Sequence, residues 1–97
     1  MEKDFKYVKL FDVYRQLLTE KKQQIFESYY FYDLSLSEIA SIQGISRQGV
    51  LNALADAKNQ LTFFEEKLKF VENKSKLLNA LEEKDLDLIK KIITEEM

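Results

Sequence analysis

Three side chains near the middle of the chain have the chemistry needed to read the edges of nucleobases. The guanidinium of Arg47 could bind a guanine edge or a phosphate through two parallel hydrogen bonds, and the amides of Gln48 and Asn52 suit adenine. On a helix these residues share an outward, N-terminal side with Ser46 and Leu51. A recognition helix presents that side to the major groove, so we expect all five residues to contact nucleic acid.

The charge around these residues is low for a nucleic-acid interface. Residues 35–60 contain two basic and two acidic side chains, and the whole chain carries a net charge of −2. Lys21, Lys22 and Lys58 could form a phosphate-contacting rim with Arg47; the alternative is that these lysines are scattered over the surface. Binding would then depend on local clustering of charge and not on a positive field of the whole protein.

The elements that would position these side chains form a predicted helix-turn-helix over residues 35–60. Ser35 and Glu38 have the spacing of a capping box at a helix start. Gly44 can close that helix in the left-handed conformation, and Ser46 can cap the next helix. Ala40 is small enough to let the two helices cross closely. The alternative is an ordinary helical hairpin that fits this pattern by accident.

The rest of the chain is also predicted to be helical, because it contains no Pro and only two Gly. A first helix should run from about Phe5 to Leu18, and Thr19 should cap a second helix. The aromatic run "YYFY" at 29–32 could stack on bases, but its position beside an apolar stripe favours the core. The sequence therefore predicts an all-α fold.

Apolar residues then recur at intervals of four and three from Val50 to Val71, which predicts one continuous helix of about 39 Å counted from the Ser46 cap. A break within 59–62 would be compatible with the helix propensities of that segment. Residues 72–76, "ENKSK", are predicted to form a turn, and Asp85 could cap a last helix.

This apolar seam extends beyond the part that a helix-turn-helix can cover, which predicts a homodimer. The expected dimer interface consists of Leu61, Phe64, Leu68, Phe70 and Val71. The alternative is a monomer in which residues 77–93 cover the seam. We expect a single helical domain over 1–97, with a C-terminal helical extension at 61–97.

Several classes of function are disfavoured by what the sequence lacks. Without Cys or His there is no disulfide, no thiolate zinc site and no histidine base. No phosphate-cradling glycine loop and no nucleophile–base pair is visible. We therefore predict a protein that is not an enzyme and that needs no metal or cofactor. No signal peptide and no run of about 18 apolar residues occurs, so we expect a cytoplasmic protein without membrane insertion.

The segment "LTEKKQQIFESYYFYDLSLSEIASIQGISRQGV" resembles the region 4 helix-turn-helix of bacterial sigma factors, which reads the −35 promoter element. It is more similar still to the YlxM family of helix-turn-helix proteins. That family combines a Leu-Thr-Glu-Lys start, an aromatic second helix and a Leu-Ser-Leu-x-Glu-Ile-Ala…Ser-Arg-Gln core. Two features depart from a strong DNA reader, because Gly49 interrupts the recognition helix and Asp56 would repel phosphate.

The resemblance implies an all-helical, cytoplasmic protein linked to the signal recognition particle pathway. Two functions stay open at this point. The first is a regulator that binds DNA through the helix-turn-helix. The second is a protein-interaction or RNA-associated accessory module of the protein-targeting machinery, with RNA or signal recognition particle components as its partners and no DNA binding.

Overall fold

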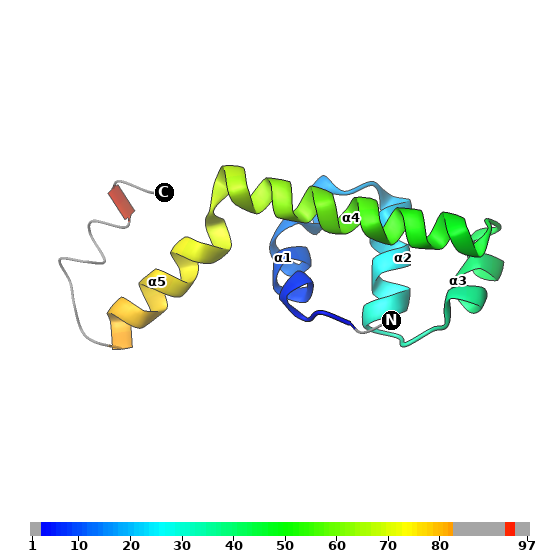
Figure 1. Ribbon diagram of the computed structural model, residues 1–97. Helices are drawn as coiled ribbons and strands as arrows, with labels where there is room; N and C mark the ends of the chain where they lie inside the picture. The colour runs from blue at the N-terminus through cyan, green and yellow to red at the C-terminus, as the bar shows by residue number, and fades with distance from the viewer. Residues whose placement is uncertain (1–2, 83–92, 95–97) are drawn as a thin grey trace. The chain divides into compact units, whose positions relative to one another are not determined.

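The computed structural model describes residues 3–82 and 93–94 of the chain, and it divides the chain into two compact units, residues 1–62 and residues 63–97 (Figure 1). Every regular element in the described part is helical, which confirms the all-α class. The elements in chain order are α1 (Lys6–Tyr14), the 3-10 turn η1 (Arg15–Leu17), α2 (Glu20–Tyr30), α3 (Leu36–Gln43), α4 (Arg47–Leu68) and α5 (Phe70–Glu82). Most of α4 belongs to the first unit.

The first helix is shorter than the sequence predicted, because α1 ends at Tyr14 and a 3-10 turn replaces its expected last residues. Leu18 is then extended, with ψ of 152°. This extension lets Thr19 act as the predicted cap of α2, where its side chain accepts a hydrogen bond from the Lys22 backbone N–H at 3.3 Å.

The predicted helix-turn-helix boundaries are confirmed at both helix starts and at the turn. The Ser35 Oγ accepts from the Glu38 N–H at 3.1 Å, and the Glu38 carboxylate accepts from the Ser35 N–H at 3.0 Å, which completes the capping box. Hydrogen bonding to the Glu38 carboxyl by Ser35, through its backbone N–H first and its side chain second, holds the pKa of that carboxyl below its ordinary value of 4.5. Gly44 closes α3 with φ of 66°, in the left-handed region.

The core of the first unit lies where α1, α2 and α3 pack along the first part of α4 (Figure 1). The rings of Phe11 and Phe26 stack at 4.2 Å, and the rings of Phe26 and Tyr30 stack at 4.3 Å. The heptad positions of α4 that join this core are Val50, Leu54, Ala57 and Leu61, each at most 1% exposed.

The aromatic run at 29–32 is only half in the core. Tyr29 and Tyr30 are buried as predicted, whereas Phe31 and Tyr32 are 49% and 70% exposed. The difference arises because α2 ends at Tyr30 and the chain turns away through Asp33, which has a φ of 54°. Phe31 keeps a tilted contact with the ring of Phe11 at 5.9 Å.

The second unit contains the end of α4 and all of α5. Helix α4 continues without interruption through 59–62, so the break considered there is absent, and the helix ends instead before Lys69, whose φ is 50°. The turn predicted at 72–76 is wrong, since these residues lie within α5. The Glu65 carboxylate caps α5 by accepting hydrogen bonds from the N–H groups of Val71 and Glu72, both at 3.1 Å. The helix expected after Asp85 lies outside the described residues.

Candidate nucleic-acid interface

The start of α4 is held by a cap that exposes the predicted base-reading side chains. The Ser46 Oγ accepts a hydrogen bond from the Gly49 N–H at 2.9 Å, as predicted for this residue. Arg47, Gln48 and Asn52 are exposed, and Leu51 is half-buried. Because the cap satisfies an amide at the first turn, the backbone there is fixed and its positive dipole end faces solvent.

Gln48 and Asn52 form a pair across one turn of α4. The Gln48 Nε2 donates to the Asn52 Oδ1 at 3.0 Å. This bond uses a donor of one amide and the acceptor of the other. The Gln48 oxygen can then accept and the Asn52 NH₂ can then donate toward solvent. One acceptor and one donor therefore stand side by side on the exposed face of the helix.

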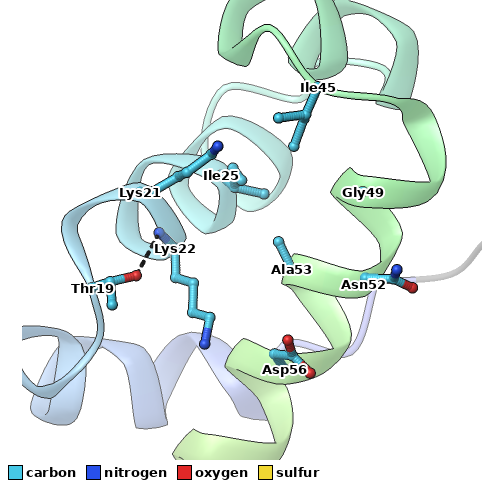
Figure 2. A pocket seen from close by; sticks show the side chains of 9 residues that line it. All are labelled: Thr19, Lys21, Lys22, Ile25, Ile45, Gly49, Asn52, Ala53 and Asp56. Carbon is cyan, nitrogen blue, oxygen red and sulfur yellow. Dashed lines mark hydrogen bonds between the residues drawn. The ribbon is translucent and has the colours of Figure 1, made fainter.

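An open groove of about 320 Å³ lies beside this face, between the N-terminal turn of α2 and helix α4 (Figure 2). Its apolar lining comes from Ile25, Ile45 and Ala53. Lys21 and Lys22 line the α2 side, and Asn52 and Asp56 line the α4 side. The groove therefore combines an apolar lining with charges of both signs.

Gly49 occupies the third position of α4, next to the serine that caps the helix. A Cβ at that position would lie 3.3 Å from the Ser46 Oγ and 3.5 Å from the Ile45 side chain. A residue with a side chain would therefore require a shift of a few tenths of an ångström in the Ser46 side chain.

The three lysines that were predicted to form a phosphate-contacting rim have different surroundings. Lys21 is exposed beside the groove. Lys22 also lines the groove, but its Nζ donates to the Gln60 Oε1 at 3.0 Å. The Nζ of Lys58 lies 5.5 Å from the ring centre of Tyr7 on α1, and Lys58 does not line the groove. The structure therefore brings Lys21 and Lys22 together and separates Lys58 from them.

The chain contains two arginines, and Arg47 is the exposed one. The other arginine, Arg15, forms an ion pair and a hydrogen bond with the Glu27 carboxylate, and its guanidinium lies 4.8 Å from the ring centre of Phe11. Arg15 therefore holds the 3-10 turn against α2. The positive charge near the start of α4 comes from Arg47 and the two lysines, and the Asp56 carboxylate opposes it.

The residues predicted for a dimer interface fall into three environments. Leu61 is fully buried in the core of the first unit, so its side chain is not available to a partner in this conformation. Phe64 and Val71 are half-buried. Leu68 and Phe70 are 55% and 49% exposed.

Other kinds of site are not apparent in the described residues. Within residues 3–82 and 93–94, no group of three or more acidic, Cys or His side chains is arranged to hold a metal ion. None of the helices in this part combines the length and apolar character that a membrane span requires.

Sequence reasoning missed the groove itself, because it depends on how α2 packs against α4 and not on the pattern of either helix. The contribution of Ile45 and Ala53 to its lining could not be predicted for this reason. The pairing of Gln48 with Asn52 had a usable signal, since two amides four residues apart on a helix are within hydrogen-bonding reach.

The sequence of the helix-turn-helix and its flanking helices is similar to that of known proteins. A family model described as "Putative helix-turn-helix protein, YlxM / p13 like" matches residues 1–96. A UPF0122 protein of Thermoanaerobacter sp. (strain X514) is 43% identical over 93 residues, which cover 93% of this chain and 80% of that protein. A UPF0122 protein of Caldanaerobacter subterraneus subsp. tengcongensis is 47% identical over 83 residues, covering 84% of this chain and 71% of the relative. The chain therefore belongs to the UPF0122 family of YlxM/p13-like helix-turn-helix proteins.

Proposed function

We propose that this protein is a regulatory protein that binds DNA by inserting the start of α4 into the major groove. The observation that carries the proposal is the Ser46-capped first turn, which presents exposed Arg47 next to the Gln48–Asn52 pair. Membership of a helix-turn-helix family supports the same function. Such a regulator would act in the cytoplasm.

The exposed groups match what the major groove offers. Adenine presents an N6 donor and an N7 acceptor there, and guanine presents two acceptors. The acceptor of Gln48 and the donor of Asn52 together complement adenine, and the two outer N–H groups of Arg47 complement guanine or a phosphate. Leu51, which lies between Gln48 and Asn52 in the sequence of α4, can contact a thymine methyl group.

Contacts to the DNA backbone would come from few groups. Lys21 is exposed at the start of α2, and the N-terminal turns of α2 and α4 add partial positive charge. Lys22 contributes less, because its Nζ is engaged by Gln60, and Asp56 on the groove wall repels phosphate. We therefore expect weak binding with a shallow dependence on salt, so that little of this small affinity remains at physiological ionic strength.

The test is the affinity for a labelled duplex, measured by fluorescence anisotropy at low ionic strength. Arg47→Ala should weaken binding by about 1–3 kcal/mol, roughly 5-fold to 150-fold, and should leave thermal stability nearly unchanged because Arg47 is exposed. Lys9→Ala removes the same charge from an exposed position on α1 and serves as the control. If both variants bind like the wild type, α4 does not dock in the groove.

A second candidate function is favoured by the charge of the motif. Residues 35–60 carry equal numbers of basic and acidic side chains, which suits a protein or folded-RNA partner better than duplex DNA. In this alternative the protein is an accessory module of the protein-targeting machinery and binds RNA or other signal recognition particle components. Capture from native lysate with and without nuclease separates the two functions. Partners that survive nuclease and include no DNA would favour the accessory module.

A further inference from the structure

The second unit contains many apolar side chains but no apolar core among the residues described. Among the described side chains of residues 63–82, one is buried, and it is the polar Asn73, at 1% exposure. The exposed large apolar side chains in this stretch are Phe63, Leu68, Phe70, Leu78 and Leu81, which are 49–58% exposed. Every buried apolar side chain in the described part lies between Phe11 and Leu61.

A unit of this size needs support from outside its own core. Folded units below about 40 residues usually require a disulfide, a metal ion or association with another chain, and this unit contains about 35 residues. The chain has no Cys, and no group of potential metal ligands occurs among the described residues. Of these three routes, association with another chain is the one that the described residues point to.

The exposed apolar residues of α5 form a stripe on one side of the helix. At 3.6 residues per turn, Phe70, Leu78 and Leu81 fall within about 80° of the helix circumference. Together with Leu68 at the end of α4, these half-exposed side chains present on the order of 350–400 Å² of apolar surface. A stable interface buries about 800 Å² on each partner, of which somewhat more than half is apolar. The stripe would therefore supply most of the apolar area of such an interface.

The charge of this stretch favours a second copy of the same chain as the occupant. Residues 63–82 contain four Lys and four Glu, so two identical surfaces meet without net repulsion. Two of these charges are already paired within the helix, since the Lys76 Nζ lies 3.4 Å from the Glu72 Oε1. An apolar stripe with a balanced polar border is self-complementary, as an interface related by a two-fold axis requires.

We propose that the protein is a homodimer in which the α5 stripe, formed by Phe70, Leu78 and Leu81 together with Leu68, packs against the same stripe of a second copy. The interface therefore differs from the one that the sequence predicted. Leu61 is excluded because it is buried within one chain, and the half-buried Phe64 and Val71 are not part of the exposed stripe. Leu78 and Leu81 take their place. The inference is independent of what the start of α4 binds.

Sedimentation equilibrium of the full chain at micromolar concentration tests the proposal. The wild type should have twice the chain mass of 11.5 kDa. The double variant Leu78→Lys/Leu81→Lys should sediment at 11.5 kDa, because two charges per copy would be buried in the interface. Ile42→Lys places a lysine at a 66% exposed apolar position on α3 and should leave the mass of the dimer unchanged.

Folding of the first unit can be followed separately. All five tyrosines lie within residues 1–62, so the near-UV tyrosine signal reports on that unit. This signal should be the same in the wild type and in the double variant. A wild-type mass of 11.5 kDa at every concentration would overturn the dimer. A dimeric double variant would overturn the assignment of the interface to the α5 stripe.

Discussion

The two units of this chain use similar helices with opposite results for burial. In the first unit, α4 contributes Val50, Leu54, Ala57 and Leu61 to a core that three other elements share, and each of these residues is at most 1% exposed. The same spacing continues into the second unit, where Leu68 is 55% exposed. A regular apolar spacing thus identifies the face of a helix that can be buried, but whether it is buried depends on the elements available to cover it.

The largest difference between buried and exposed positions is expected in the core of the first unit. Ile39→Ala on α3 removes a side chain that is 0% exposed and should lower the free energy of unfolding by about 2–5 kcal/mol. Ile42→Ala makes the same change three residues along the same helix at a 66% exposed position, and should shift stability by less than about 0.5 kcal/mol. Urea denaturation measures both. Equal losses would mean that burial does not distinguish the two faces of α3.

A smaller effect is expected at the break between α4 and α5. Lys69 adopts a φ of 50°, which costs a residue with a side chain about 1–2 kcal/mol. Lys69→Gly should therefore stabilise the break by roughly 0.5–1 kcal/mol, after allowance for the greater freedom of glycine in the unfolded chain. Lys67→Gly, in the last turn of α4, should destabilise that helix by about 1 kcal/mol.

Hydrogen exchange of the Lys69 and Asn73 amides, which donate to Glu65 and Lys69 carbonyls, reports this difference directly. Exchange should slow in Lys69→Gly and quicken in Lys67→Gly. Faster exchange in both variants would contradict a strained residue at the break.

The smallest effect concerns the pH dependence of the first unit. Bonds from Ser35 lower the pKa of Glu38 in the folded state, so the charged carboxylate stabilises the fold above the unfolded pKa of about 4.5. This stabilisation is lost as the pH falls through the folded pKa. Glu38→Gln keeps an acceptor for the Ser35 N–H but removes the charge.

The difference in melting temperature between wild type and Glu38→Gln should accordingly be present near neutral pH and shrink as the pH falls below 4.5 and through the lower pKa of the folded state. Glu66→Gln, at an exposed position of α4 outside any cap, serves as the control. A wild-type advantage that does not shrink at any acidic pH at which the protein is folded would show that the charge of Glu38 is not involved.

The helix-turn-helix could be predicted because its boundaries depend on local chemistry. Ser35, Glu38, Gly44 and Ser46 each act on residues within five positions along the chain, and all four act as the sequence suggested. Arg47 was predicted to be exposed because it directly follows the capping residue Ser46, and it is exposed in the structure.

The second unit was predicted less well, because its break has no marker in the sequence. A lysine occupies the left-handed position where glycine is usual, and the cap of α5 comes from Glu65, which precedes that helix by five residues. In the candidate site, the groove and the different surroundings of Lys22 and Lys58 arise from packing between helices that are distant in sequence. Spacing within one helix contains no information about such contacts.

The proposed binding of duplex DNA by the start of α4 through few cationic groups is tested most directly by its salt dependence. Anisotropy titrations of a labelled random-sequence duplex, repeated over a series of salt concentrations, give the slope of log affinity against log salt. A slope on the order of −2 to −4 is expected, with little binding at ~0.15 M salt. On a random-sequence duplex Arg47 contacts phosphate and not a particular guanine, so Arg47→Ala should reduce the size of the slope by about 1. Nanomolar binding at ~0.15 M salt, or a slope that Arg47→Ala leaves unchanged, would contradict it.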